Sequence, residues 1–571
     1  MNIVLYVPDN RITKNYMPVL WPWLLKALTP GDHRVTIMDG NAERLAPQEL
    51  ASVMRSRRID LVGIGGMTRT IQTAYDAADE IRKLGIPVIM GGPHVSSDGG
   101  FLGPDPDEIT KEALEHCDSV IAGEADEIWP KVLGDAQAGR LAPRYRAASK
   151  PDLRNYPRIP WEEANLNQFS IIPDVMKRLV RASGYPEFDF NLTPVETGRG
   201  CPYGCEFCTV TNFFGEKVRV RSIDSVVQEI LLLKELRRRF IFFVDDNFAI
   251  YDKFGHIDTN LKDHSRRLMQ AMIDAKATVP WAAQISSNLL DPETPDGREL
   301  VDLMRGAKCI GVYVGLESVL PASLKDVSKS FNKPATYART LSYLHRSGIY
   351  AVTGFIYGMD SDRVGVAKNT WEFVRQYPPS TIPVFSQLTP LPGTPQFAKL
   401  RQEGRLVEKH WRDYRPYTAA FRPKQMSEVE LRDEVRSAWS MAYAPEAIYD
   451  RMRGMRDRPL FERLIIFVAN MCFRGVFFPQ MNLKAWLRLF WENRKSFWEV
   501  FCRSRRLTRR IQLDDAAPRA RDRARVPAMA SGRTGPAAPQ PACAGNATDE
   551  TNGLHDDTPG PVPSEPPVLT A

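Results

Sequence analysis

Short apolar runs alternate with amphipathic stretches over residues 1–140. The stretches, such as Thr70–Leu84, carry apolar residues at helical spacing. Strands that alternate with helices of this length predict a parallel, doubly wound α/β sheet. The predicted strands are Ile3–Val7, Arg34–Met38, Asp60–Ile64, Pro87–Met90 and Ser119–Ala122.

A second alternation of the same kind extends over residues 191–400. Helical stretches such as Ser225–Arg238, Lys262–Ala275 and Pro334–Ser347 separate its apolar runs. The pattern predicts a partial (β/α)6 barrel whose site lies at the carboxyl ends of the strands. Residues 141–190 are rich in Pro, Asn, Tyr and Trp and predict a surface connector. The predicted barrel strands are Leu192–Thr197, Phe240–Val244, Trp281–Ser286, Ile310–Gly315, Ala351–Ile356 and Val384–Leu388.

Residues 401–510 read as a helical region in which aromatic and basic residues interleave. Its apolar run Leu464–Phe473 lies between Arg463 and Arg474 and is shorter than the roughly 20 residues that a membrane span needs. We expect either an interfacial amphipathic surface or a helical cap that buries the aromatic residues. No aromatic residue follows Phe501, so residues 511–571, with Cys543, are predicted to be a disordered tail that holds no ligand.

The amino-acid composition excludes several classes of protein. The 571 residues are 43% hydrophobic and 25% charged, which excludes global disorder, collagen and a polytopic membrane protein. The net charge of +7 is too dilute over this length to predict nucleic acid as a partner. The N-terminus lacks the features of a secretory signal, and eight Cys make no disulfide framework, so we expect a reducing, cytoplasmic location.

Three cysteines crowd into one short loop. Residues 196–208 read ETGRGCPYGCEFC, with Cys201, Cys205 and Cys208 in a C-x3-C-x2-C pattern. Three thiolates are one short of a closed zinc site, whereas they suit a four-iron cluster whose last iron stays open. Gly200 and Gly204 would let the loop wrap around such a core. The alternative is a zinc site with a distant fourth ligand, for which Cys309 is available although it begins a predicted buried strand.

Glycine-rich turns follow three strands of the first predicted sheet. They read GGMT at 65–68, GGPH at 91–94 and GE at 123–124. In doubly wound sheets the ligand crevice lies where such turns gather. The alternative is that the glycines only make tight turns. No G-x-G-x-x-G follows the first strand, so a dinucleotide site is not expected.

The cysteine loop, with the aromatic Phe207 before its last Cys, resembles that of the radical S-adenosylmethionine (SAM) enzymes. The first sheet resembles their cobalamin-binding domain, so the resemblance covers residues 1–400. It implies a [4Fe-4S] cluster whose open iron chelates SAM, and a one-electron reductant such as a flavodoxin or ferredoxin. An electron from the cluster then cleaves SAM to a 5′-deoxyadenosyl radical.

The resemblance also implies roles for residues at the strand ends, although helix caps or turns would explain each of them alone. Phe207 would lie near the adenine, Asp246 at the amino group of SAM, and Ser287 and Glu317 at its ribose or carboxylate. The stretch 354–360 resembles G-x-I-x-G-x-x-E with Asp360 in place of Glu, so that the backbone of Gly354, Ile356 and Gly358 would approach the adenine. No catalytic residue is assigned beyond the cluster.

For cobalamin the resemblance implies the turns of the first sheet. Asn41 stands where the D-x-H-x-x-G pattern of many cobalamin domains has its His. We therefore expect cobalamin without a protein His ligand, or a domain kept as scaffold without cobalamin. His94 is expected to be a surface or turn residue. The expected cobalamin-binding residues are Asn41, Gly65, Gly66, Thr68, Gly91, Gly92, Pro93, Gly123 and Glu124.

These features together predict a cobalamin-dependent radical SAM enzyme that methylates an unactivated carbon of a small hydrophobic or lipid-like substrate. The family includes hopanoid-type lipid methylases, and the basic-aromatic region adds an expected peripheral contact with the inner membrane face. One alternative is a radical SAM cyclase, oxidase or carbon–carbon coupling enzyme of the anaerobic ring-cyclase branch. Another is a non-catalytic iron–sulfur or corrinoid-binding module.

Overall fold

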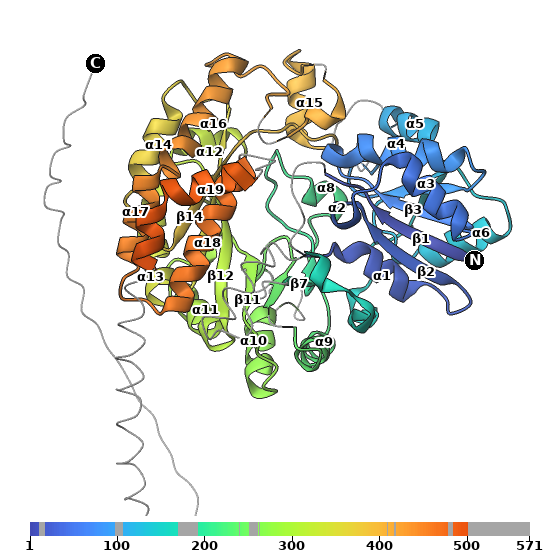
Figure 1. Cartoon of the computed structure of the whole chain (residues 1–571), viewed down its shortest axis with the longest axis horizontal. Helices are drawn as coiled ribbons and strands as arrows, with labels where there is room; N and C mark the ends of the chain where they lie inside the picture. The colour runs from blue at the N-terminus through green and yellow to red at the C-terminus, as the bar shows by residue number, and fades with distance from the viewer. Residues whose placement is uncertain are drawn as a thin grey trace, which may run out of the picture. The chain divides into compact units, whose positions relative to one another are not determined.

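A computed structural model describes most of the chain (Figure 1). The described residues are 1–10, 17–96, 107–169, 192–238, 240–250, 261, 263–407, 409–415, 418–477 and 483–500. The predicted tail 511–571, with Cys543, and connector residues 170–190 lie outside them, so these expectations stay predictions. Two six-stranded parallel sheets and a two-stranded ribbon organise the described part of the chain.

The first sheet has the strand order β2-β1-β3-β4-β5-β6 and is parallel throughout. The five predicted strands are confirmed, with ends shifted by one residue at most. A sixth strand was missed, because it lies in the segment read as a connector. The strands are β1 (Asn2–Val7), β2 (Arg34–Asp39), β3 (Leu61–Gly65), β4 (Val88–Gly91), β5 (Ser119–Ala122) and β6 (Arg144–Arg146).

Helices cover both faces of this sheet. Alternate side chains of β1 enter two separate cores, Val4 and Tyr6 on one face and Ile3 and Leu5 on the other. This division is the mark of a doubly wound sheet, as the sequence predicts. The helices are α1 (Leu20–Leu28), α2 (Gly40–Glu43), α3 (Pro47–Ser56), α4 (Ile71–Arg82), α5 (Asp107–His116) and α6 (Trp129–Gln137).

The second sheet has the strand order β14-β13-β12-β11-β10-β7, again all parallel, and forms the predicted partial barrel. All six predicted strands are present. They are β7 (Leu192–Val195), β10 (Phe240–Phe243), β11 (Trp281–Gln284), β12 (Cys309–Glu317), β13 (Tyr350–Tyr357) and β14 (Thr381–Gln387). The helices between them are α9 (Ile223–Glu235), α10 (His264–Asp274), α11 (Pro295–Gly306), α12 (Pro321–Asp326), α13 (Pro334–Arg346) and α14 (Val366–Val374).

The helices after the barrel divide their apolar residues between core and surface. They are α15 (Pro395–Gln402), α16 (Glu428–Ala442), α17 (Pro445–Gly454), α18 (Leu460–Phe477) and α19 (Leu483–Glu492). Leu464, Ile466 and Phe467 of α18 are buried in the barrel core, as a helical cap would bury them. Trp491 at the end of α19 and Trp498 beyond it are each 68% exposed. None of the described helices is long and apolar enough to cross a membrane.

Candidate active site

The cysteine loop leaves and rejoins one small ribbon at the carboxyl end of β7. Strand β8 (Gly198–Arg199) precedes the loop, and β9 (Arg219–Val220) follows it after the short helix α8 (Val210–Phe213). Gly200 has a φ of +95°, and a Cβ there would lie 2.6 Å from the carbonyl oxygen of Lys217. Only glycine fits this turn, because other residues would meet both backbone strain and a clash. Gly204 has open space beside it instead.

The three cysteines lie on one partly buried loop. Cys205 is buried, while Cys201 and Cys208 are partly exposed. Burial raises the pKa of Cys205 to about 11 and that of Cys208 to about 12, and the neighbouring cysteines add to both shifts. Such thiols stay protonated at neutral pH unless a metal centre stabilises the thiolates.

The donor set fits an iron–sulfur cluster better than a single ion. Among the described residues, no group of three or more His, Cys, Asp or Glu side chains is arranged to hold one metal ion. A single tetrahedral zinc would need thiolates within about 4 Å of one another, because Zn–S bonds are about 2.3 Å long. A cluster spreads its three thiolates over three irons, which suits three cysteines on a loop with an open side at Gly204.

Cys309 is remote from this loop. It begins β12, whereas Glu317 ends that strand and contacts Lys329, whose charge interacts with Cys205. A nine-residue strand is roughly 26 Å long from end to end. Cys309 is buried, and its Sγ donates to the carbonyl oxygen of Gly311. The structure therefore gives no support to a four-thiolate zinc site that uses Cys309.

A lysine that the sequence did not reveal lies against the loop. The Nζ of Lys329 donates to Glu317 Oε1 at 2.6 Å, and both side chains are nearly buried. The same ammonium lies 5.8 Å from the ring centroids of both Phe207 and Phe331. Tyr203 stacks on Phe331 at 3.9 Å. Lys329 therefore brings Phe207 and Glu317 together beside the cysteines. No sequence pattern near Lys329 predicts this contact.

Three polar residues follow β10, and each makes hydrogen bonds with a different partner. Asp245 accepts hydrogen bonds from the backbone N–H and the hydroxyl of Thr197. Asn247 exchanges hydrogen bonds with Ser286. Asp246 accepts from the Gly200 N–H at 3.4 Å, which places its carboxyl at the first turn of the cysteine loop. Burial raises the pKa of Asp246 to about 7.

The other expected SAM residues lie at later strand ends. Ser287 is buried and donates to Asn332 Oδ1 at 3.0 Å. Gly354 and Ile356 lie within β13, and a Cβ on Gly354 would come within 2.8 Å of the Tyr313 hydroxyl. The Gly358 N–H donates to Asp362, a buried carboxyl that sequence reasoning missed.

Asp360, which was matched to the family's Glu, makes ion pairs instead. Its carboxylate contacts Lys399, Arg405 and Lys424. The hydrogen bonds that hold the turn after β13 come from Asp362, which accepts from the N–H groups of both Gly358 and Met359. The geometry of this turn therefore depends on the carboxyl two positions later in the chain.

The turns after β3 and β4 pack backbone against backbone. The Gly66 N–H donates to the Gly91 carbonyl oxygen at 2.8 Å. Gly92 has a φ of +101°, and a Cβ there would lie 2.7 Å from the carbonyl oxygen of Gly66. A Cβ on Gly65 would meet the ring of Trp21 at 2.6 Å. Pro93 and Thr68 belong to the same pair of turns, so the expected cobalamin residues from β3 and β4 are brought together.

His94 lies in its turn as expected, but the expectation of a surface position is wrong. It is 1% exposed, its Nδ1 lies 3.1 Å from the Thr68 hydroxyl, and its ring meets Trp411 edge-on at 4.8 Å. Burial lowers the pKa of His94 to about 3, so the ring is neutral at physiological pH. Trp411 follows the barrel in the sequence, and no sequence pattern around it predicts that it covers this turn.

Asn41 and Glu124 are both engaged with other parts of the chain. Asn41 accepts from the Asn10 N–H at 2.9 Å and donates to Pro8 and Asp39. Gly123 is linked to the turn after β4, because its backbone N–H donates to the Ser96 Oγ at 2.8 Å. Glu124 makes ion pairs with Arg199 and Arg219 on either side of the cysteine loop. Their roles toward cobalamin stay predictions.

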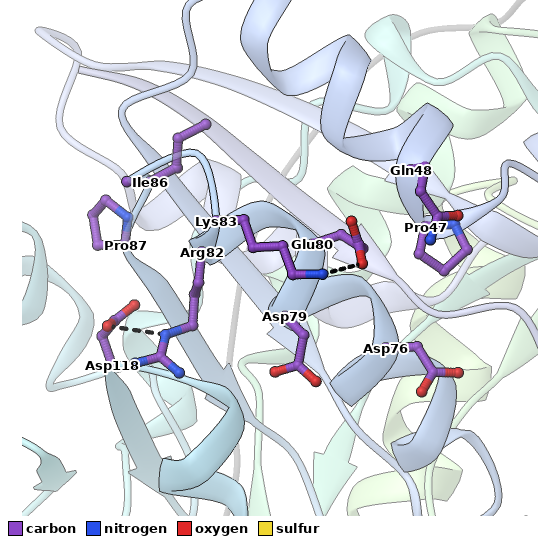
Figure 2. Close-up of a pocket in the computed structure, with 11 residues that line it drawn as sticks. Pro47, Gln48, Asp76, Asp79, Glu80, Arg82, Lys83, Ile86, Pro87 and Asp118 are labelled. Atoms are coloured by element: carbon purple, nitrogen blue, oxygen red, sulfur yellow. Dashed lines mark hydrogen bonds and ion pairs between the residues drawn. The ribbon is translucent and has the colours of Figure 1, made fainter.

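A large hollow lies away from both of these edges. It has a volume of about 930 Å³ and lies between α3, α4 and the amino ends of β4 and β5. Figure 2 shows the polar side chains that line it. Arg82 pairs with Asp118, and Lys83 pairs with Glu80, across or beside it. Ligands of doubly wound sheets bind at the carboxyl ends, so this hollow is on the opposite edge from the expected crevice.

Comparison with known proteins identifies the class. Residues 195–363 match the radical SAM superfamily and residues 12–133 match the B12 binding domain. The chain is 30% identical over 424 residues to the bacteriochlorophyllide d C-12(1)-methyltransferase of Chlorobaculum tepidum, covering 74% of this chain and 81% of the relative. The chain therefore belongs to the cobalamin-binding radical SAM enzymes, whose cofactors are a [4Fe-4S] cluster, SAM and cobalamin.

Within that class several of its relatives are methyltransferases, and others are anaerobic magnesium-protoporphyrin IX monomethyl ester cyclases. The chain is 25% identical over 451 residues to the hopanoid C-2 methylase of Rhodopseudomonas palustris, covering 76% of this chain and 73% of the relative. The radical SAM methyltransferase TsrM from Kitasatospora setae has the same fold, with a TM-score of 0.54 at 17% identity, over 70% of this chain and 76% of that one. The chain is a radical SAM enzyme of the cobalamin-dependent methyltransferase family.

Proposed function

We propose that this enzyme transfers a methyl group to an unactivated carbon of a hydrophobic, lipid-like substrate. The observation that carries the proposal is the cysteine loop at the carboxyl end of a parallel sheet, in a chain that also exposes an aromatic-basic surface. When bound, the cluster and SAM supply a radical that removes hydrogen from carbon, and cobalamin supplies the methyl group. A flavodoxin or ferredoxin is the proposed one-electron donor.

For the cluster, we assign Cys201, Cys205 and Cys208 as the ligands. The support is their shared loop, their mutual electrostatic interaction and the fixed turn at Gly200. Lys329 supplies positive charge beside thiolates that burial otherwise disfavours. It would thereby favour the deprotonated form that binds iron.

For SAM, we assign the residues that line the carboxyl ends of the second sheet. Asp246 presents a carboxyl at the start of the loop, where it can accept from an ammonium group. Phe207 and Glu317 lie beside Lys329. The remaining proposed contacts are Ser287, Gly354, Ile356 and Gly358.

For cobalamin, we assign the turns after β3, β4 and β5 and no protein ligand to cobalt. Asn41 stands at the position where a His would ligate, and its side chain is already bonded to Pro8, Asp39 and Asn10. The imidazole of His94 is buried against Thr68 and Trp411. Backbone turns that approach one another closely offer a broad surface to a macrocycle.

For the substrate, we propose a water-insoluble molecule that the enzyme binds at a membrane surface. Leu487, Trp491 and Trp498 are 61%, 68% and 68% exposed, and the guanidinium of Arg494 lies 4.7 Å from the ring centroid of Trp491. The exposed Lys495 adds positive charge to this aromatic-basic surface, and the exposed Arg488 pairs with Glu492 at 2.8 Å. Interleaved aromatic and basic residues suit the interface of anionic lipids, so we propose peripheral contact with the inner membrane face from the cytoplasm.

The methylation proposal is tested with anaerobically reconstituted enzyme, hydroxocobalamin, a chemical reductant and SAM that carries a deuterated methyl group. Incubation with a total lipid extract should give a lipid that carries the label, detected by mass spectrometry. Formation of 5′-deoxyadenosine without any labelled product would contradict methylation and favour a cyclase or oxidase.

Membrane contact is tested by sedimentation with phosphatidylglycerol vesicles. The Trp491→Ala and Trp498→Ala double variant should bind at least about tenfold less, because each indole contributes apolar area to the interface. Phe373→Ala is the matched control, since Phe373 is also exposed (46%) but lies on α14. Equal sedimentation of the double variant and the control would remove the membrane proposal.

A further inference from the structure

The cysteine loop starts and finishes at two opposed cations. In the β8–β9 ribbon, Arg199 and Arg219 are direct cross-strand partners. Like charges at such positions repel one another and destabilise the pairing. The ribbon that closes the loop therefore needs an anion that both guanidinium groups can share.

Glu124 supplies that anion from the other sheet. Its Oε2 accepts from Arg199 Nη1 at 2.7 Å and from Arg219 Nη1 at 3.0 Å, and its Oε1 accepts from Arg219 Nη2 at 2.8 Å. The side chain of Glu124 is 2% exposed and that of Arg199 is 4% exposed. Solvent and salt screen such pairs weakly, so Glu124, Arg199 and Arg219, which we call the Glu124 clasp, are strongly coupled. A third cation, the more exposed Lys150, lies 3.3 Å from Glu124 Oε1.

Further contacts fix the clasp in place. Arg199 also binds Asp126 at 3.0 Å and Glu196 at 2.9 Å, and Arg219 Nη1 donates to the Pro151 carbonyl oxygen. Burial alone would raise the pKa of Glu124, but the hydrogen bonds and charges of Arg219 and Arg199 outweigh it and lower that pKa. Glu124 is therefore a carboxylate at neutral pH.

On its other side the clasp reaches the turn after β4. Glu124 directly follows Gly123, whose N–H donates to Ser96 Oγ at 2.8 Å. The same hydroxyl donates to the Gly92 carbonyl oxygen at 2.8 Å. A continuous set of hydrogen bonds thus connects the turn at Gly92 with the residue two positions before Cys201.

We propose that Glu124 is a positioning residue that fastens both ends of the cysteine loop to the carboxyl edge of the first sheet. It would thereby fix the cluster site relative to the cobalamin site. The inference rests on the proposed function, because it takes the first edge to bind cobalamin and the loop to bind the cluster. Reactions between two held groups are sensitive to placement, and a 1 Å error costs about 100-fold in rate.

The test measures hydrogen–deuterium exchange of peptides covering residues 198–220, in the full chain with reconstituted cluster, without and with hydroxocobalamin. In the wild-type chain hydroxocobalamin should slow this exchange. In Glu124→Gln the exchange should be about tenfold faster, because the amide pairs poorly with two cations, and hydroxocobalamin should no longer slow it. Glu162→Gln is the matched control, since Glu162 pairs with Arg158 while 41% exposed, and it should respond as wild type.

The outcomes separate the clasp from the proposed function. A normal response of residues 198–220 in Glu124→Gln overturns the positioning role, as does a wild-type chain that binds hydroxocobalamin and four irons but shows no response there. If the wild-type chain binds no hydroxocobalamin, the visible spectrum shows it, and the proposed function fails together with this inference. Should Glu124→Gln not fold, Arg219→Lys replaces it, with a weakened response expected and an unchanged response contradicting the role.

Discussion

The carboxyl edges of the two parallel sheets have contrasting chemistry. On the first sheet the turns after β3 and β4 are made of backbone and neutral side chains, with Gly66 against Gly92 and a neutral His94 on Thr68. The one charged group described above at this edge, Glu124 after β5, is paired with arginines of the cysteine loop. On the second sheet the edge carries three thiols, the Asp246 carboxyl and the Glu317–Lys329 ion pair. Both sheets are parallel, but the first is doubly wound and the second has its strands in chain order. The residues that follow their strands give them two different kinds of site.

The contrast matches the two kinds of cofactor that the family binds. A broad macrocycle can be recognised by shape, which closely packed backbone turns provide. An inorganic cluster and a charged sulfonium cofactor need thiolates, carboxylates and cations at fixed places. Substitutions on one edge should therefore leave the cofactor of the other edge in place.

The largest effect is expected at the charged edge. Cys205→Ala should abolish cluster incorporation and SAM cleavage, because a cluster bound by three thiolates loses one corner. Iron analysis and 5′-deoxyadenosine formation measure this loss. Hydroxocobalamin binding, read from the visible spectrum, should persist, since Cys205 lies on the second sheet's loop.

Cys309→Ala is the matched control for that substitution. Cys309 is buried at the opposite end of β12, so its loss should leave a small cavity and cost about 1 kcal/mol of stability. Four irons per chain should remain. Iron loss in Cys309→Ala would show that this thiol is a ligand and would contradict the assignment of three cysteines.

A medium effect is expected at the neutral edge. Gly92→Ala places a Cβ 2.7 Å from the Gly66 carbonyl oxygen at a φ of +101°, and should lower the free energy of unfolding by about 2–4 kcal/mol. Hydroxocobalamin should bind more weakly, while iron content and SAM cleavage stay normal. Chemical denaturation and spectral titration measure the two effects.

Gly85→Ala separates backbone strain from the clash. Gly85 also has a positive φ, +75°, but a Cβ there would have no neighbour within 4 Å. Its substitution should cost only about 1–2 kcal/mol and leave cobalamin binding unchanged. Equal effects of Gly92→Ala and Gly85→Ala would mean that the close approach of the two turns is unimportant.

The smallest effect concerns the neutral state of His94. Burial lowers its pKa in the folded chain to about 3 from 6.5, so the unfolded chain binds a proton first as the pH falls. The stability contributed by the neutral ring is complete above pH 6.5 and is lost progressively from 6.5 toward 3. Between pH 6.5 and pH 5 the loss should be about 2 kcal/mol.

His94→Gln should remove that part of the pH dependence, because glutamine does not titrate. Urea unfolding of both chains at pH 7 and pH 5 gives the comparison. A wild-type chain that loses no more stability than His94→Gln over this interval would contradict a buried, neutral imidazole.

Both sheets were predictable from the sequence because their strands are continuous apolar runs separated by amphipathic helices. Two differences have clear physical causes. β6 has charged residues at both ends, Arg144 and Arg146, and only Tyr145 is buried, so it gave no apolar signal. β14 begins at Thr381, before Pro383, which sequence rules place outside a strand; it fits here because β14 is an edge strand.

The candidate site could be proposed from the sequence where neighbouring residues bear the chemistry, as in the three cysteines and the glycine turns, and their roles stay predictions. It was not predictable where partners come from distant segments. Lys329 reaches the cysteine loop, Trp411 covers His94, and Arg199 and Arg219 engage Glu124. Such contacts depend on how the chain folds back, which neither periodicity nor spacing encodes.

The position of β14 at the edge of its sheet has a consequence for self-association of the protein. An open barrel ends in a strand whose unused carbonyl groups invite pairing with another chain. Here side chains from α16 and its C-terminal cap occupy two of these carbonyl groups. The Trp439 indole N–H donates to the Phe385 carbonyl oxygen, and the Tyr443 hydroxyl donates to the Pro383 carbonyl oxygen. With those acceptors occupied and no N–H on the proline, this border offers little template for intermolecular β-sheet growth.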